Sequence, residues 1–434
     1  MTAAAKLLLA AVLAMGVAMP AQAAAVTYRG TIGGQAVGVE ITDATEDALV
    51  GRFFWTMHGV DIPLQPRPGA GGTIVLAEEG ACGPALCARD PENYDIVTRV
   101  PIVATWSLVL SPDGARLNGT RQDMRTAEVA AIALERVGHR TLPPNVTIDP
   151  FTLHDVRTGE APRYSDGMVA GELYYDTLKL DVALMEGPVV IIDGSSVTYV
   201  TDPRTQFAFP RILSLADGSD PGPANRVLAR LHGRMSLEAL DCMSAIHMGF
   251  GWDDRDEQAW GTLGYYDAEE MLVTYLSPRV MSWNQSGTLY CDGVEGYEHS
   301  DSYNLDVRAG TQLDLTRVLA GVTARRYSDP STVVDPALVQ LTPGDPHWHF
   351  DAEIIDWLLA NLEPLANPPE NTNCVTSELI DGHVGVHFEA EDVIVFALER
   401  LPHFTSMCAR TLASTPVTAL PAQFTVPGSD YFDN

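Results

Sequence analysis

The chain has 434 residues and a formal net charge of −30, because 57 Asp and Glu residues outnumber 27 Lys and Arg residues. So acidic a surface repels nucleic acid and anionic lipid headgroups, and the composition therefore argues against both as partners. The length exceeds that of one typical hydrophobic core and predicts about two domains.

Residues 1–23 are expected to be a secretory signal peptide. Lys6 provides its positive end, residues 7–17 are apolar, and residues 20–23 form a small-x-small pattern that predicts cleavage after Ala23. The apolar run is too short to span a bilayer, and no later stretch approaches about 20 consecutive apolar residues. We therefore expect a periplasmic or secreted protein without membrane insertion.

Residues 26–137 predict an all-β domain. Apolar and polar residues alternate at 37–41, 73–76, 104–110 and 132–137, and glycine-rich turns separate these runs. Short alternating strands with such turns are typical of an antiparallel meander that curls into a small barrel or sandwich.

Residues 138–163 interrupt this pattern with prolines and scattered polar residues, and we interpret them as a linker. Residues 164–428 then predict an α+β domain with two main helices on a mostly antiparallel sheet. The helices are expected at 224–245 and after Asp351, since both segments place apolar residues on one face. The strands of this domain are expected at 178–184, 189–199, 271–279, 384–388 and 393–397.

The six cysteines of an exported chain predict disulfide bonds, although zinc is the alternative for cysteine clusters. Zinc is disfavoured because the sequence contains no paired C-x-x-C motif. Cys82 and Cys87 are close enough in sequence to close a Gly-Pro turn. Sequence does not choose among the remaining pairings. The expected bridges are Cys82–Cys87, Cys242–Cys291 and Cys374–Cys408.

The stretch YCDGVEGYEHSDSYNLD, residues 290–306, is the main candidate binding segment. Its tyrosines would supply contact area of the kind found at interfaces, and its carboxylates would steer a basic partner. It lacks the alternating Asp or Asn ligands and the terminal Glu of a calcium loop, so we interpret it as a disulfide-bridged surface turn. Asp306 is expected to fix the turn before Gly310. The candidate binding residues are Tyr290, Glu295, Tyr297, Glu298, His299, Asp301 and Tyr303.

Histidines at strand spacing are the second candidate for site chemistry. His383 and His387 would share one face of a strand, and His347 and His349 form a similar pair. Without an H-E-x-x-H helix, a packing or surface role is favoured over metal binding. No metal site and no cofactor is therefore assigned. The companion ligands considered are His403 and Glu389.

Sequence signals for catalysis are weak, and no catalytic residue is assigned. The chain has no G-x-S-x-G elbow, no S-x-x-K motif with its companions and no phosphate-binding glycine loop. Paired carboxylates for glycan hydrolysis remain an alternative, because their separation is a property of the folded chain.

The order of motifs from residue 271 to 315 resembles the RsiV-like domain family of exported bacterial proteins. A strand with a serine at its end leads to a Tyr-x-Gly turn, an Asn-x-Asp strand, a glycine turn and a Leu-x-Leu helix start. Where that family's turn reads Gly-Gly-Ala-His, this chain has residues 292–296 and then Glu298-His299, which puts a shared binding role in doubt. The matching residues are Ser282, Tyr290, Gly293, Asn304, Asp306, Gly310, Leu313 and Leu315.

The resemblance implies an envelope-facing recognition domain, since relatives include the lysozyme-sensing part of an anti-sigma factor and an accessory domain of peptidoglycan deacetylases. We therefore expect a non-catalytic envelope protein whose partner is a cationic envelope-active protein, such as a lysozyme-like hydrolase, or a peptidoglycan fragment. The alternatives are a cell-wall hydrolase that uses carboxylates or a histidine-bound metal, and a structural envelope component.

Overall fold

The protein is described by a computed structural model in which strands dominate, with 49% strand against 20% helix. The expected α+β class is therefore wrong. Its described residues are 24–42, 49–83, 86–89, 97–142, 174–248, 266–289, 297–326, 329–341, 346–363, 380, 382–401, 405, 408–427 and 431–432.

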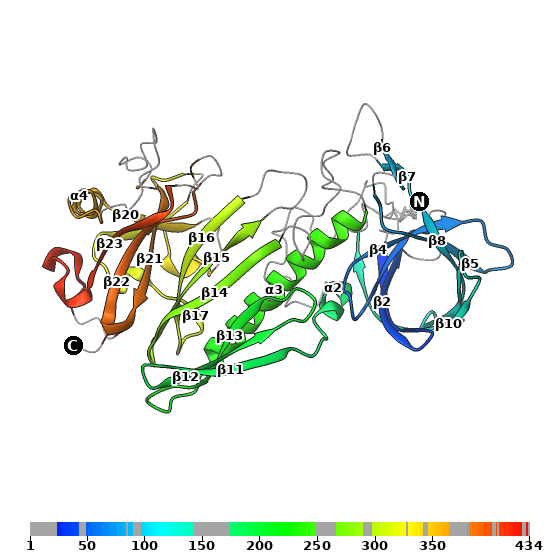
Figure 1. Ribbon diagram of the computed structural model, residues 1–434, viewed down its shortest axis with the longest axis horizontal. Helices are drawn as coiled ribbons and strands as arrows, with labels where there is room; N and C mark the ends of the chain where they lie inside the picture. The colour runs from blue at the N-terminus through cyan, green and yellow to red at the C-terminus, as the bar shows by residue number, and fades with distance from the viewer. Residues whose placement is uncertain are drawn as a thin grey trace, which may run out of the picture.

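Eight antiparallel strands close into a barrel at one end of the molecule (Figure 1), in the order β1-β10-β9-β8-β5-β4-β3-β2. Strand β10 continues past Val137 to Thr141 and pairs there with Ala24 of β1. Alternation along the strands sends every second side chain inward, so the interior is filled by apolar groups such as Val39, Phe53 and Trp106. The barrel strands are β1 Ala24–Ile32, β2 Gln35–Thr42, β3 Gly51–Trp55, β4 Ile62–Arg67, β5 Ile74–Glu79, β8 Ile102–Leu110, β9 Arg116–Asp123 and β10 Val129–Thr141, while β6 Ala88–Arg89 and β7 Val97–Arg99 form a separate ribbon.

The short helix α2 (Tyr174–Lys179) packs on the outside of the barrel. The strand expected at 178–184 is wrong, because residues 178–179 end this helix and residues 180–184 form neither helix nor strand. Lys179 Nζ lies 2.7 Å from Asp61 Oδ1, and Arg52 of β3 donates from Nη1 to Asp61 Oδ2 at 2.8 Å. Arg52 also lies 3.6 Å from Asp176 of α2 and 2.9 Å from Glu40 of β2. All five side chains are at most 1% exposed, so the contact between α2 and the barrel is built from buried charges.

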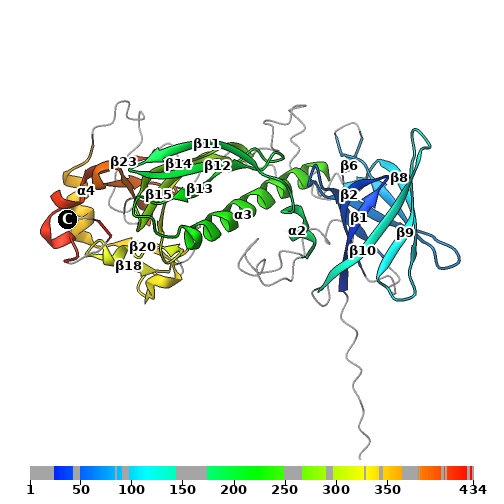
Figure 2. The same cartoon turned by 90° about the horizontal axis from the view of Figure 1, so that it is seen from below.

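The long helix α3 (Gly222–His247) confirms the helix expected at 224–245 and runs along the middle of the molecule to the barrel (Figure 2). Its apolar side, including Leu228 and Met235, packs in one core with strands of two sheets. Near its end it reaches the barrel, where Ser244 Oγ accepts from the Asp61 backbone N–H at 2.8 Å. The first sheet is β11 Met185–Ile192, β12 Ser195–Thr201 and β13 Ala208–Ser214, and the second is β14 Tyr266–Leu276, β15 Val280–Leu289, β16 Tyr297–Asp306 and β17 Thr311–Gln312.

The C-terminal part adds two three-stranded sheets around a third core at the opposite end from the barrel (Figure 1). Helix α4 (Ala352–Ala360) confirms the helix expected after Asp351, whose side chain caps it by accepting from the Ile354 N–H. The strands are β18 Val322–Arg325, β19 Val333–Val334, β20 His347–Phe350, β21 Val384–Glu389, β22 Val393–Leu398 and β23 Arg410–Pro416, and the short 3-10 helices are η2 Leu315–Arg317, η3 Pro336–Leu338, η4 Ala390–Asp392, η6 Val417–Ala419 and η7 Ala422–Phe424.

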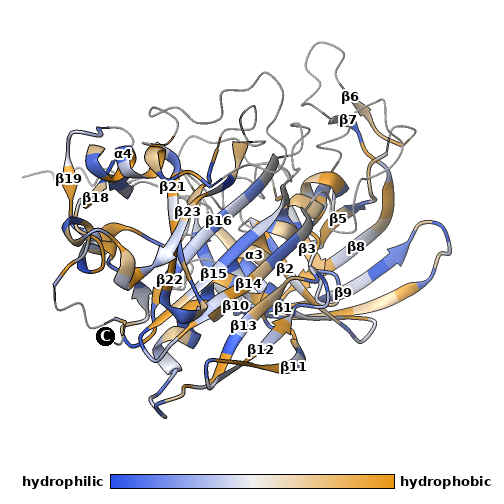
Figure 3. Ribbon diagram, turned by 60° about the vertical axis from the view of Figure 1, so that its left-hand side comes forward, coloured by the Kyte–Doolittle hydropathy of each residue, from blue (hydrophilic) through white to orange (hydrophobic). Residues whose placement is uncertain are grey.

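The α+β expectation failed because these strands form several small sheets instead of one sheet under two helices. In the sheet β11–β13, the edge strand β11 exposes the consecutive apolar residues 189–191. Figure 3 colours the ribbon of this strand by its hydropathy. Among the described residues, none of the helices combines the length and the apolar character needed to cross a membrane.

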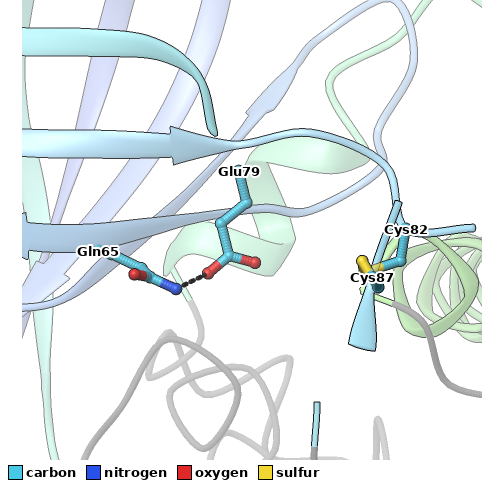
Figure 4. The surroundings of a disulfide bond; sticks show 4 residues. All are labelled: Gln65, Glu79, Cys82 and Cys87. Carbon is cyan, nitrogen blue, oxygen red and sulfur yellow. Dashed lines mark hydrogen bonds between the residues drawn. A yellow bond between two sulfur atoms is a disulfide. The ribbon is translucent and has the colours of Figure 1, made fainter. Parts of the chain in front are cut away.

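The Cys82–Cys87 disulfide is present as predicted (Figure 4). It follows β5, and the Cys82 N–H donates to the His247 carbonyl at the end of α3 over 2.8 Å. Cys242 and Cys408 are also disulfide-bonded. The partners expected for them, Cys291 and Cys374, lie outside the described residues.

Candidate functional site

The predicted binding stretch is a β-strand from Tyr297 onward, so the surface turn expected there is wrong for that half. Asp301 and Tyr303 are only 5% and 4% exposed, which removes them from any solvent-facing recognition surface. Outside the described residues lie Tyr290 and Glu295, together with the side chains of Tyr297 and Glu298.

His299 is held between two carboxylates in the sheet. Its Nε2 lies 2.6 Å from Glu269 Oε1, and its Nδ1 lies 3.0 Å from Asp301 Oδ2. Glu269 reaches His299 across β15 at Gly287, where any side chain would collide with the Glu269 carboxyl group. Burial lowers the pKa of His299, but the hydrogen bonds to Asp301 and Glu269 outweigh it and raise the pKa to about 9. At neutral pH His299 is therefore an imidazolium that balances buried charge.

Tyr303 packs inside the molecule instead of offering contact area. Its ring stacks on Trp283 with the centroids 5.3 Å apart, and the Arg400 guanidinium lies 5.8 Å from the ring centroid. Burial raises the pKa of its hydroxyl far above the usual range. Tyr303 therefore contributes to the core that positions its neighbours on β16.

Ser302, between these residues on β16, joins the sheet to β21. Its Oγ lies 3.0 Å from His387 Nδ1, and His387 Nε2 lies 3.5 Å from Glu389 Oε1. Burial lowers the pKa of His387, so the imidazole is neutral. The order of groups resembles a nucleophile, a base and an acid, but the cavity beside Ser302 measures only about 20 Å³, which is room for about one water. We therefore assign these residues to the support of the cavity wall.

Glu399 and Arg400, which follow β22, form the polar centre of that cavity. Glu399 Oε2 accepts from the Ser302 N–H at 2.9 Å, while Glu399 Oε1 has no hydrogen-bond partner among the described residues. Arg400 Nε lies 3.8 Å from both Glu399 Oε1 and Asp301 Oδ1. Burial, opposed by Arg400 and assisted by Asp301, raises the pKa of Glu399 to about 8. At neutral pH Glu399 is therefore mostly a protonated acid.

Gly385 makes room for this carboxyl group. An added Cβ at Gly385 would overlap the Glu399 carboxyl oxygens, and Gly385 itself lines the cavity. Glycine is therefore required at position 385 because another side chain lies against its backbone, and not because of a turn conformation.

A groove of about 450 Å³ lies against the cavity, because Gln312, Val339 and Gln340 line both. This volume falls in the range of small-molecule sites. Its walls come from helix α3, from the turn that leads into β17, and from the segment around η3. The groove is therefore bounded by three elements that are distant in sequence.

Two arginines from α3, Arg230 and Arg234, line the groove. They continue a row that begins at Arg226, since residues four apart lie on one face of a helix. The groove's carboxylates are already engaged: Asp314 Oδ1 accepts from the Thr316 N–H at 3.0 Å, and Asp335 Oδ1 accepts from the Ala337 N–H at 3.0 Å. Arg234 Nε lies 3.6 Å from Glu238 Oε1 on the next turn of the helix. The guanidinium groups have N–H donors of the kind that bind an acceptor-rich, anionic ligand.

Other predicted residues have local roles. Asp306 Oδ1 accepts from the N–H groups of Arg308 and Ala309 at 3.1 and 2.8 Å, so it fixes the turn before Gly310 as predicted. Within the described part of the chain, no group of three or more His, Cys, Asp or Glu side chains could hold a metal ion. His383 and His347 line the cavity, and His403 lies outside the described residues.

Sequence reasoning missed the groove and the cavity. The spacing of Arg226, Arg230 and Arg234 on a predicted helix was a usable signal for a basic row. No local signal marks Glu399 or Gly385, because their relation depends on the pairing of β21 with β22. Comparisons with protein-family models, with curated proteins and with solved structures gave no match to this chain.

Proposed function

We propose that this chain is a periplasmic or secreted binding protein whose groove takes an acidic sugar of the kind found in peptidoglycan fragments. The observation that carries the proposal is the groove of about 450 Å³ into which α3 directs Arg230 and Arg234. In a protein of net charge −30, this wall brings two arginines together, beside Asp314 and Asp335 whose carboxylate oxygens accept hydrogen bonds from their own turns.

The polar character of the remaining wall supports a sugar over an apolar ligand. Thr311, Gln312 and Gln340 supply hydroxyl and amide groups, which can donate to and accept from sugar hydroxyls. The export signal and the resemblance to the RsiV-like family support an envelope ligand. Both are predictions from sequence alone.

Binding of N-acetylmuramic acid, compared with N-acetylglucosamine, tests the proposal by isothermal titration calorimetry. The two sugars differ by a carboxylate-bearing lactyl group, so we expect the acidic sugar to bind more tightly and to weaken as salt is added. Arg234→Met should reduce its affinity about 10-fold, because a charge-assisted hydrogen bond is lost.

The matched control is Arg226→Met, which removes an exposed arginine from the same helix face outside the groove. Its affinity should equal that of the unmodified protein. Equal binding of the two sugars, or no saturable binding of either, would overturn the proposal.

Recognition of a cationic envelope-active protein is a second candidate, supported by the net charge of −30. Because Asp301 and Tyr303 are buried, a surface that binds a cationic protein would have to lie elsewhere than at these residues of β16. Binding of a lysozyme at low salt, measured by surface plasmon resonance, tests this candidate independently of the groove.

A further inference from the structure

We propose that the small cavity behind the groove is an anchoring subsite that accepts one neutral oxygen of the bound sugar, a hydroxyl or amide carbonyl, through a hydrogen bond from the Glu399 carboxylic acid. The proposal rests on the proposed function, because the groove must first hold the sugar. The cavity proposal identifies a residue that would recognise a neutral group of the sugar, and it predicts how the affinity depends on pH.

The geometry fixes which oxygen of Glu399 can serve. Oε2 already accepts a backbone N–H from Ser302 at 2.9 Å, so the acid proton resides on Oε1. Oε1 has no hydrogen-bond partner among the described residues, although Glu399 is only 3% exposed. A buried donor without a partner is costly, and a ligand oxygen in the cavity would remove that cost.

The cavity has the size and lining for a single polar group. Its volume of about 20 Å³ fits one water-sized group, and Ser302, His383 and Arg400 contribute further polar walls. His383 Nδ1 is also buried and lacks a hydrogen bond within the described residues. A ligand oxygen in this cavity would meet several donors and acceptors.

Burial favours the protonated form of Glu399, and the neighbouring charges act in both directions. Asp301 on β16 raises the pKa of Glu399, while Arg400 lowers it. Burial lowers the pKa values of His383 and His387, so these rings stay neutral above pH 7. The other ionisable side chains nearby are His299 beyond Asp301, His347 on β20 and the exposed Glu389 on β21.

The consequence is a pH-dependent affinity with a definite sign. Below the pKa of about 8 the acid donates to the ligand, and above it the ionised carboxylate has no proton to donate and repels an anionic sugar. Affinity for N-acetylmuramic acid should therefore be constant from pH 6 to 7 and fall about 10-fold per pH unit well above 8. Binding should also raise the pKa of Glu399, which a carbon-13 NMR titration of the side-chain carboxyl measures directly.

Glu399→Gln separates this proposal from the proposed function. Glutamine keeps an N–H donor and an acceptor for Ser302 but does not ionise, so its binding should lose the fall above pH 8. Glu399→Leu should reduce affinity at pH 7 while leaving the preference for N-acetylmuramic acid over N-acetylglucosamine intact, since Arg230 and Arg234 set that preference.

Three results decide the matter. Binding that is specific for the acidic sugar but identical in both Glu399 variants and flat between pH 6 and 9 overturns the cavity proposal alone. No binding by the unmodified chain overturns both proposals. A fall above pH 8 that persists in Glu399→Gln assigns the titration to His299 and also overturns the role of Glu399. Circular dichroism of each variant controls for folding.

Discussion

Glu399 and His299 make the folded protein hold more protons than the unfolded chain. Both have pKa values above their ordinary ones, about 8 against 4.5 for Glu399 and about 9 against 6.5 for His299. Because its carboxylate partners favour the imidazolium, His299 stabilises the folded protein. This stabilisation is fully present below pH 6.5 and is lost as pH rises through 9. Glu399 acts in the same direction because the folded protein disfavours its ionised form. The joint contribution of these two groups to the free energy of unfolding should therefore decline as pH rises from about 4.5 to 9.

Replacing Glu399 by glutamine should remove part of that decline. In the unmodified protein, unfolding is favoured by ionisation of Glu399 once pH exceeds 4.5, and the effect levels off above 8. Glu399→Gln should thus equal the unmodified protein near pH 4.5 and exceed it at pH 8.5 by about 2–4 kcal/mol of unfolding free energy. Urea unfolding at the two pH values measures the difference. A constant difference between the two pH values would contradict a raised pKa.

At the scale of elements, strand β21 approaches the end of β22 closely only because residue 385 is glycine. Gly385→Ala should destabilise the protein by roughly 2–5 kcal/mol, since the new methyl group overlaps the buried Glu399 carboxyl. Gly382→Ala, three residues earlier, is the matched control because nothing lies within 4 Å of its added Cβ. The midpoint of thermal unfolding reports both.

A double variant shows whether the Glu399 contact is the cause. Gly385→Ala combined with Glu399→Ala should be more stable than the sum of the separate losses predicts, because the overlap disappears. If the two losses of stability simply add, the added methyl group destabilises the protein through a contact other than the Glu399 carboxyl group.

The periodic spacing of apolar residues predicted the two main helices, but the sequence did not predict which strands pair into which sheets. The apolar stripe that includes Leu228 and Met235 predicted α3, and the stripe from Ile354 to Leu358 predicted α4. The run at 178–184 also carries apolar residues, yet its first two residues end a helix, and the buried Lys179 ammonium group pairs with Asp61 of the barrel. Such a pairing between distant residues has no periodic signature.

The site was hidden for the same reason. The acidic stretch around His299 attracted attention through composition, whereas its carboxylates serve to balance buried positive charge. Glu399 belongs to no motif and was not among the predicted site residues. Its raised pKa comes from burial and from Asp301, and both depend on how β16 meets the C-terminal sheet.

At the scale of the whole molecule, the buried network at Arg52 joins the barrel to the rest of the chain. Arg52→Met should cost about 3–5 kcal/mol, because Glu40 and Asp61 would lose a partner in a site that excludes water. Arg29→Met is the control: its ion pair with Asp181 also joins the barrel to the segment after α2, but the two side chains are 61% and 58% exposed. That change should cost less than about 1 kcal/mol. Equal losses of unfolding free energy in the two variants would show that the buried network stabilises the contact no more than the exposed ion pair does.

The same network makes the two sides of the contact interdependent. Arg52 and Glu40 come from the barrel, whereas Asp176 and Lys179 come from α2, so each side provides counter-ions that the other requires. If the chain were cut within residues 143–173, separation of the barrel from α2 would require water to solvate charged groups that had lost their buried counter-ions. The broken chain would then behave as a noncovalent complex of two complementary fragments, whose reassembly is specified by electrostatic matching and no longer by the peptide connection.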